Sequence, residues 1–291
     1  MTQTDAINQR TWKQKLAEYK RQPLSLLLLI LTILAAAITV LILFSLIAYI
    51  LIKGVPNLKP ELFEWNYTTE NCSMMPAIIN TIEMTLLTLL IAVPIGVCSA
   101  IYLVEYAKRG NKLVKMIWMT TETLQGIPSI VFGLFGYLLF VITCKMNVSL
   151  LGGAITLALM VLPLIMRTTE EALLSVPDSF REGSFGLGAG RLRTVFKIIL
   201  PSAMPGILAG VILAVGRIVG ETAALMYTAG TAAGICDSPL SSCRTLAVHM
   251  YQLLCEGMYM DAAYATAVVL LVLVILINML SNFIAKRLTK R

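Results

Sequence analysis

Charged residues are scarce in this chain of 291 residues: only 13% are Asp, Glu, Lys or Arg, whereas 58% are hydrophobic. A typical soluble domain carries about twice that share of charge. The apolar stretches also leave no polar block that is large enough to fold alone. The composition therefore excludes a soluble globular protein and predicts an all-α integral membrane protein.

Several chemical signatures are missing as well. The sequence has a single histidine, His249, and no pair of cysteines with CxxC spacing, so it offers no metal-binding motif. It shows neither a Ser/His/Asp set nor paired carboxylates of the glycosidase type. No GxxxxGK[ST] loop is present to hold nucleotide phosphates. We therefore expect that the chain is not an enzyme and binds no cofactor of its own.

Six apolar stretches are long enough to cross a bilayer, which takes about 20 residues. They cover residues 24–52, 76–103, 124–144, 150–174, 205–229 and 262–285. The first stretch follows a polar leader without a cleavage site for a signal peptide, so it should remain as a membrane helix. A transmembrane domain is thus predicted at 24–285, between a basic leader at 1–23 and a basic tail at 286–291.

The basic residues lie mainly on one side of these spans. Eighteen of the 23 fall in the leader, in the tail and in the segments 104–123 and 167–204, and only four fall in the connections on the other side. The positive-inside rule therefore predicts that both termini are cytoplasmic. The net charge of +7 then reflects orientation in a lipid bilayer rather than binding to nucleic acid.

Two charges interrupt the fifth stretch, which reads "AVGRIVGETAAL" at 214–225. An arginine at the bilayer centre costs about 2.5–3.5 kcal/mol on insertion scales, so Arg217 needs a partner or a wet cavity. Glu221 lies one helical turn further on and can supply that partner. The guanidinium fork of Arg217 can also bind an oxyanion through two parallel hydrogen bonds.

Arg167 repeats this pattern near the end of the fourth stretch, with Glu170 and Glu171 three and four residues further on. It should lie close to the cytoplasmic mouth, with Arg217 deeper, so that the two are staggered along one path if both helices face the interior. An alternative stays open. Arg217–Glu221 and Arg167–Glu170 can instead be buried ion pairs that fix helix packing.

Small residues recur at four-residue spacing in the fifth stretch. They stand first at Gly206, Gly210 and Ala214, and again at Gly216, Gly220 and Ala224. Such stripes let membrane helices approach closely, so we predict close packing along both.

The longest cytoplasmic connection reads "SVPDSFREGSFGLGAGRLRTVFKIILPSAMPG" at 175–206. Pro177 can start a short helix, which the following glycines end. Pro201 and Pro205 are expected to block a continuous helix from the second half of this segment into the fifth span. A short exposed helix between two bends is predicted.

This connection resembles the EAA loop of ABC importer permeases, which reads E-A-A, three residues, G, nine residues, I-x-L-P. The matching residues within 175–204 are Glu182, Gly183, Ser184, Gly188, Ile198, Leu200 and Pro201, with Gly-Ser in place of Ala-Ala. The resemblance implies a type I (MetI-like) permease fold with six transmembrane helices. It also implies that the short helix docks on a cytoplasmic ATPase, which supplies the ATP hydrolysis. An ordinary interfacial helix without a partner is the alternative.

Four further strings are similar to the permeases of the bacterial phosphate importer, and the length and the six spans resemble its A-type subunit. They are "AIYLVEY" at 100–106, "GIPSIVFGLFG" at 126–136, "IMRTTEEALLSVP" at 165–177 and "RIVGETAAL" at 217–225. The resemblance implies that Arg217, Glu221, Arg167 and Glu170 line the substrate path. It also implies three partners: a second, C-type permease, a dimer of cytoplasmic ATP-binding subunits, and an extracytoplasmic phosphate-binding protein.

We therefore expect a multi-pass permease of the bacterial inner membrane that forms half of the path for inorganic phosphate import. Two alternatives remain. The cargo can be another oxyanion such as sulfate or molybdate, because the EAA loop reports the coupling machinery alone. The chain can also be an ion-driven secondary transporter or channel, which needs no docking loop.

The outer side carries most of the cysteines and the histidine. Cys236 and Cys243 share an outer loop, where an oxidising compartment would let them pair. Other pairings stay open, because Cys72, Cys144 and Cys255 also lie near the outer face. His249 is expected to be a structural or surface residue rather than a ligand.

Overall fold

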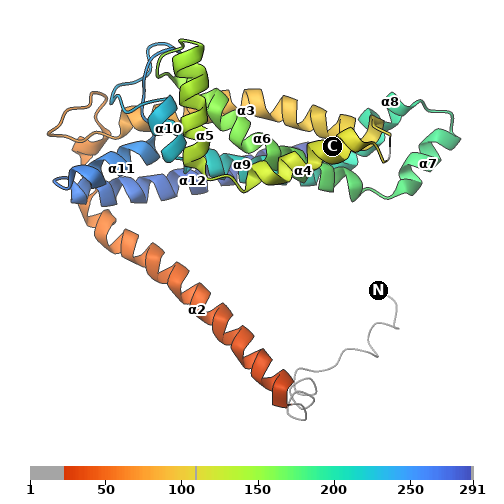
Figure 1. Cartoon of the computed structure of the whole chain (residues 1–291). Coiled ribbons are helices and arrows are strands. Elements are labelled where there is room, and N and C mark those ends of the chain that lie inside the picture. Colours follow the sequence, from red (N-terminus) through yellow and green to blue (C-terminus); the bar gives the residue numbers. More distant parts are fainter. Residues whose placement is uncertain (1–22, 109, 290–291) are drawn as a thin grey trace. The chain divides into compact units, whose positions relative to one another are not determined.

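The computed structural model describes residues 23–108 and 110–289, and these ranges are helical and contain no β-strand (Figure 1). The predicted leader lies outside the described residues except for Pro23, and so do the last two residues of the tail. In the described part, five helical runs are long and apolar enough to cross a membrane, and a sharply bent pair can make a sixth span. These findings confirm the predicted all-α architecture.

The elements follow one another along the chain in this order. They are α2 (Pro23–Gly54), η2 (Val55–Asn57), η3 (Pro60–Phe63), α3 (Met75–Ile101), η4 (Tyr102–Tyr106), α4 (Lys112–Gln125), α5 (Ser129–Gly136), η5 (Tyr137–Thr143), α6 (Leu150–Leu174), α7 (Asp178–Gly186), α8 (Arg191–Thr194), η6 (Val195–Ile199), α9 (Leu200–Val219), α10 (Ala223–Thr228), α11 (Leu246–Glu256) and α12 (Met260–Thr289). Three of them, η4, η5 and η6, are π-helical turns.

Of the described residues, those up to Ile52 and those from Lys53 onward belong to two separate compact units. The first unit contains nearly all of α2, whose side chains are apolar on every side and exposed along most of the helix. That pattern is typical of a helix surrounded by lipid. The second unit contains all the other helices and every candidate site residue.

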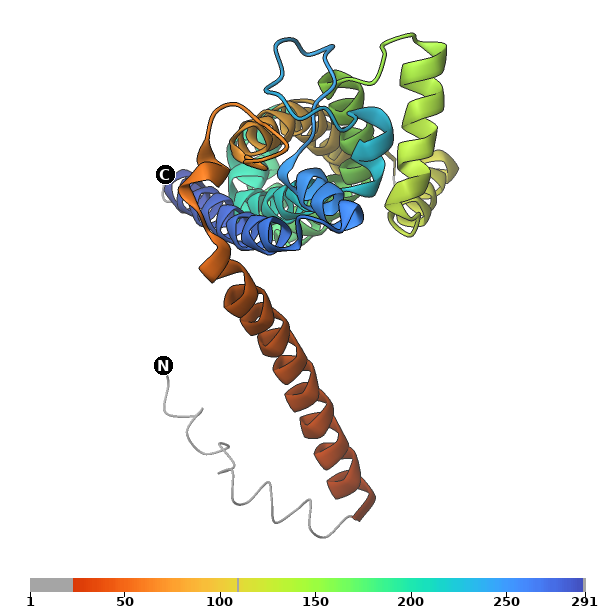
Figure 2. The same cartoon turned by 90° about the vertical axis from the view of Figure 1, so that its left-hand side faces the viewer.

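Four long helices, α3, α6, α9 and α12, lie side by side in the second unit (Figures 1 and 2). The central one is α6, because 67% of its apolar window is buried, against 33% for α3. The helix begins where the hydroxyl of Ser149 accepts a hydrogen bond from the amide of Gly152, which caps its first turn. Its observed bounds equal the predicted stretch 150–174.

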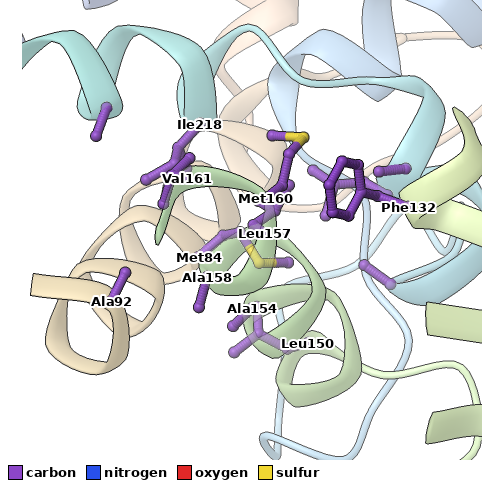
Figure 3. Packing of buried hydrophobic residues seen from close by; sticks show 14 of the residues in the cluster. Met84, Ala92, Phe132, Leu150, Ala154, Leu157, Ala158, Met160, Val161 and Ile218 are labelled. Carbon is purple, nitrogen blue, oxygen red and sulfur yellow. The ribbon is translucent and has the colours of Figure 1, made fainter. Parts of the chain in front are cut away.

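The main apolar core surrounds α6. Figure 3 shows Leu157, Ala158 and Val161 of α6 among side chains of α3, α5 and α9. Because lipid is as apolar as these side chains, close packing rather than removal from water holds such helices together. A Cβ added to Gly206 of α9 would come within 2.6 Å of the Ala172 methyl carbon on α6. The first predicted stripe of small residues is thus a tight helix contact.

The bundle has two ends of different composition. At one end lie α7 and α8, and at the other lies α11 together with the loops at 58–74 and 230–245 (Figure 1). We call these the α7 end and the α11 end. Each end has its own apolar cluster, around Leu173 and Ile199 at the α7 end and around Met74 and Leu246 at the α11 end.

The segment predicted as one span at 124–144 is broken. α4 ends before Gly126, α5 begins after Pro128, and the two helix axes meet at 105°. Proline disfavours helical geometry in the residue before it, so a helix that enters this segment ends there. As a result α5 stands across the direction of α3 and α6 (Figures 1 and 2).

The prediction that Pro201 and Pro205 interrupt the helix into the fifth span is wrong. The chain is helical without a break from Arg191 to Val219. In η6 the amide of Leu200 bonds back five residues to the carbonyl of Val195, so the helix widens directly before Pro201. This π-helical turn accommodates Pro201, which stands in the first turn of α9, whereas Pro205 lies inside that helix without ending it.

Candidate functional site

Arg217 lies in the last turn of α9, which ends at Val219. Its side chain is half-buried, and no carboxylate of the described residues lies within 4.0 Å of its guanidinium. The C-terminal end of a helix carries a partial negative charge, which stabilises a nearby cation by about 0.3–1 kcal/mol. The position therefore tolerates the charge while the donors of the guanidinium stay free of a carboxylate.

Glu221 does not form the predicted pair with Arg217. The chain leaves helical geometry after Val219, and Glu221 stands in the break before α10. Its buried carboxylate accepts a hydrogen bond from the amide of Ala224 at 3.1 Å. Negative charge is favoured at the start of a helix. The ion-pair interpretation of Arg217 and Glu221 is thus wrong for this conformation, and so is the second small-residue stripe, because Gly216 and Ala224 belong to different helices.

The two short helices that follow the breaks lie side by side (Figure 1). A Cβ added to Gly133 of α5 would come within 2.7 Å of the Cα of Ala224 on α10, and one added to Gly136 within 2.9 Å of the Thr228 methyl carbon. Since both residue numbers rise together, α5 and α10 run in the same direction. Glycine is required here because the backbones approach so closely.

The two breaks also lie at a similar level of the central helix. Gln125, the last residue of α4, donates a hydrogen bond to the carbonyl of Pro163 on α6 at 3.1 Å. Ile218, next to Arg217, packs in the same apolar cluster as Val161, two residues from Pro163. Transporters commonly place their substrate sites where discontinuous helices meet inside the membrane. Arg217 lies beside one of the two breaks, in the last turn of α9.

Arg167 sits among three carboxylates. Its Nη1 is 3.0 Å from Glu170 and 3.5 Å from Glu122 of α4, and its Nε is 2.9 Å from Glu171. Glu170 is mostly buried, whereas the other two carboxylates are exposed. The proximity that the i+3 and i+4 spacing predicts is therefore present, and Arg167 is occupied by ion pairs in this conformation while Arg217 is not.

The two arginines lie at different levels of the bundle. Gly210 of α9 packs on Thr168 of α6, the neighbour of Arg167. Arg217 follows Gly210 by seven residues, which corresponds to about 10 Å of helix. Arg167 is therefore nearer the α7 end and Arg217 is nearer the middle, which agrees with the staggered arrangement expected from the sequence.

The short helix predicted in the connection at 175–206 is α7. Gly188 follows it with a φ of +81°, a left-handed conformation that glycine adopts without strain. Ser184 is buried, and its hydroxyl oxygen lies 2.8 Å from that of Thr194 in α8. Glu182 and Gly183 are exposed, and a Cβ added to Gly183 would meet no described atom within 4 Å. Of these motif residues, Ser184 is thus buried within the loop, whereas Glu182 and Gly183 face outward.

The second half of the motif folds back against the first. Ser184, Gly188 and Ile198 line one cavity of about 330 Å³ between α7 and η6. Ile198 and Leu200 also pack on the apolar cluster at the α7 end, whereas Pro201 is exposed. The nine residues between Gly188 and Ile198 therefore let both parts of the motif line the same cavity.

Large apolar side chains of this loop point away from the protein. Leu187 is 90% exposed, and Phe180, Phe185, Leu192 and Phe196 are about half exposed or more. Exposed apolar groups that gather on one loop mark an interaction site.

A protein-family model described as "Binding-protein-dependent transport system inner membrane component" matches residues 92–291, which include both helix breaks, both arginines and the whole loop. The chain belongs to this family. Its members are the membrane permeases of ABC importers, which work with a second permease, separate ATPase subunits and a periplasmic binding protein.

Two relatives illustrate the range of similarity. The "Probable ABC transporter permease protein YqgI" of Bacillus subtilis (strain 168) is 35% identical over 281 residues, which are 89% of this chain and 94% of the relative. The "Phosphate transport system permease protein PstA" of Pasteurella multocida (strain Pm70) is 40% identical over 190 residues, which are 65% of this chain and 66% of that protein.

Among solved structures, a chain of the bacterial alginate ABC transporter, crystallised with its alginate pentasaccharide-bound periplasmic protein, superposes with a TM-score of 0.69 at 17% identity. The match covers 97% of this chain and 99% of that one. It confirms the predicted permease fold of ABC importers.

The permease also contains a partly buried ion pair that the sequence analysis missed. Nη2 of Arg181 in α7 lies 2.6 Å from Oε1 of Glu105 in η4. The two residues are 76 positions apart, and periodicity within either segment gives no sign of the contact. The sequence offered one signal, which is the acidic residue Glu105 near the end of the string "AIYLVEY", shortly before a basic loop.

A second missed group lies at the α11 end. The guanidinium of Arg244 stacks over the ring of Tyr67 at 4.3 Å, and His249 meets the same ring edge-on at 6.0 Å. Arg244 and His249 are both buried. Burial lowers the pKa of His249 to about 3, and the charge of Arg244 acts in the same direction. In the described ranges no three or more His, Cys, Asp or Glu side chains are placed to hold a metal ion.

All six cysteines are free thiols in the structure. Cys243 is fully buried, and Cys236 is half-buried with its sulfur 3.5 Å from the carbonyl of Ser241. Burial raises the pKa of both thiols. The pairing of Cys236 with Cys243 stays a prediction.

Proposed function

We propose that this permease is the A-type subunit of a phosphate ABC importer and forms half of the path for inorganic phosphate. Two observations support the proposal. A phosphate permease is among its relatives at 40% identity. Arg217, which carries the argument, offers a guanidinium that has no carboxylate partner among the described residues and lies beside a break in a membrane helix.

The geometry suits transient binding of an oxyanion. A guanidinium binds an oxyanion through two parallel charge-assisted hydrogen bonds, and the neighbouring Glu221 weakens the local positive field. A conduit needs sites that hold the ion weakly enough to release it. In this mechanism phosphate leaves Arg217 for the level of Arg167, where Glu170 competes for the guanidinium and prevents the ion from being trapped.

The expected surroundings follow from the same proposal. The chain lies in the bacterial inner membrane with both termini and α7 on the cytoplasmic side. A C-type permease completes the path, and a dimer of ATP-binding subunits docks on α7 and hydrolyses the ATP. An extracytoplasmic phosphate-binding protein delivers the substrate at the α11 end. The chain itself binds no cofactor and no nucleic acid.

Arg217→Gln tests the proposal in cells whose only copy of the permease carries the substitution. We expect phosphate uptake to collapse at equal membrane abundance while the ATPase still co-purifies with the permease. Arg287→Gln, which changes an exposed arginine of α12, is the matched control and should leave uptake unchanged.

Three other results would point elsewhere. Unchanged uptake in Arg217→Gln would make Arg217 a packing residue and refute the arginine path. Uptake of sulfate or molybdate in place of phosphate would identify a different oxyanion as the cargo. Uptake that persists without any ATPase would favour an ion-driven secondary transporter.

A further inference from the structure

Arg181 of α7 donates hydrogen bonds to four neighbours. Its Nη2 and Nε both donate to the carboxylate of Glu105, at 2.6 and 3.2 Å. Its Nη2 also donates to the carbonyl of Leu173 at 3.0 Å, and its Nη1 donates to the carbonyl of Val176 at 2.9 Å. The fourth acceptor is Asp178, at 3.1 Å from Nη1. One planar group thus uses all five of its N–H donors in fixed directions.

These acceptors belong to different helices. Leu173 lies in the last turn of α6 and Val176 lies two residues beyond its end, where backbone carbonyls have no partner within the helix. Glu105 lies in η4, the π-helical extension of α3. The side chains of Arg181 and Glu105 are only 16% and 9% exposed. The guanidinium of Arg181 therefore joins α7 to the end of α3 through its partly buried ion pair with Glu105, and to the end of α6 through backbone carbonyls.

The rest of α7 has little attachment to the bundle. Ser184 contacts Thr194 of α8, but the apolar side chains of Phe180 and Phe185 are exposed. The ion pair also borders a cavity of about 680 Å³ whose wall includes Glu170, a member of the carboxylate cluster around Arg167. The pair therefore lies between the exposed apolar side chains of α7 and the Arg167 end of the proposed path.

We propose that Arg181 and Glu105 are positioning residues that transmit the displacement of α7 to α3 and α6, and thereby couple ATP hydrolysis to opening of the path. This inference rests on the proposed function. The guanidinium fork fixes orientation as well as distance, so α7 cannot rotate without moving the helix ends to which it is bonded. The bond with Glu105 raises the pKa of Arg181, which keeps the guanidinium charged.

The test uses the full complex in lipid vesicles, with the partner permease, the ATPase and the phosphate-binding protein. Glu105→Gln keeps the size of the side chain and removes its charge. We expect the phosphate imported per ATP hydrolysed to fall about tenfold, a usual size for coupling between sites, while the ATPase stays bound and hydrolysis continues. Asp178→Asn is the matched control. It removes an exposed carboxylate from the same guanidinium, but this carboxylate belongs to α7 itself, so the ratio should not change.

Arg181→Lys separates the fork from the charge, because lysine keeps the charge and loses the planar geometry. We expect the ratio to fall in this variant too. A normal ratio in Glu105→Gln would overturn the inference. Loss of the ATPase from the purified variant would also overturn it, because the pair would then hold the docking surface rather than transmit its motion. If Glu105→Gln does not fold, the ratio in Arg181→Lys decides. Failure of the proposed function is distinguishable, because the unmodified complex would then import no phosphate.

Discussion

Arg217 and Glu221 are four residues apart in the sequence, yet a break in the helix separates them and they form no ion pair. Arg217 lies at the C-terminal end of α9, and Glu221 accepts a hydrogen bond from the first turn of α10. Each charge is thus stabilised by the helix end of opposite sign. The break explains how an apolar segment carries both charges without pairing them with each other.

The close contact of α5 with α10 should depend on Gly133. A Cβ at this position would come within 2.7 Å of the Cα of Ala224, and backbone atoms cannot move aside as a flexible side chain can. We expect Gly133→Ala to lower the free energy of unfolding by about 1–3 kcal/mol, the usual cost of overpacking. The midpoint of thermal unfolding of the purified permease in detergent measures this change.

Gly216→Ala is the matched control for that substitution. Gly216 lies inside α9, and a Cβ added there meets no described atom within 4 Å. Because alanine is favoured over glycine in a helix by up to about 1 kcal/mol, the variant should be as stable as the unmodified permease or more stable. Equal midpoints for Gly133→Ala and Gly216→Ala would contradict the packing argument.

The sequence was sufficient where the cause of a structure is local. The apolar stretch 150–174 matches α6 residue for residue, because the bounds of this helix depend on its own apolar length and on the capping residue Ser149 directly before it. The ion pairs of Arg167 follow from the spacing of three and four residues on one helix. The short helix α7 was also predictable, since Pro177 precedes it and Gly188 follows it.

Features that depend on distant segments were missed or misjudged. The residues from Gly126 to Pro128 indicate a break. The angle of 105° between α4 and α5 also depends on the packing of α5 against α10, which lies some ninety residues later in the sequence. Gly220 looked like a packing residue because a glycine in a membrane helix is ambiguous between packing and a break. The pairing of Arg181 with Glu105 joins segments 76 residues apart, so no single-segment pattern contains it.

Cys236 and Cys243 are predicted to form a disulfide once the loop faces an oxidising compartment. A bond that closes a loop of this length stabilises a protein by about 2–3 kcal/mol in the chain-entropy model. Burial raises the pKa of both thiols, so reduced cysteines would resist alkylation in the folded protein. The permease should therefore be isolated without reductant, denatured, alkylated and digested, and peptide mass spectrometry should find the two cysteines joined.

Cys98 is the internal control, because it lies within α3 and should be alkylated in the same sample. The variants Cys236→Ser and Cys243→Ser should each free the other thiol. Alkylation of both cysteines in the unmodified permease would refute the pairing, and linkage of either one to Cys72 would assign a different bond.

His249 should make the stability of the α11 end depend on pH. Burial, together with the charge of Arg244, lowers its pKa from 6.5 to about 3, so the folded protein keeps the imidazole neutral. The unfolded chain binds a proton below about pH 6.5. The free energy of unfolding is therefore undiminished above pH 6.5. It falls as the pH is lowered from 6.5 toward 3, because only the unfolded chain binds the proton, and the loss is about 2 kcal/mol at pH 5 by proton linkage. Thermal unfolding of the purified permease should show a lower midpoint at pH 5 than at pH 7.5. His249→Gln, which cannot titrate, should show a smaller difference between the two pH values, and an equal difference would mean that other groups cause the pH dependence.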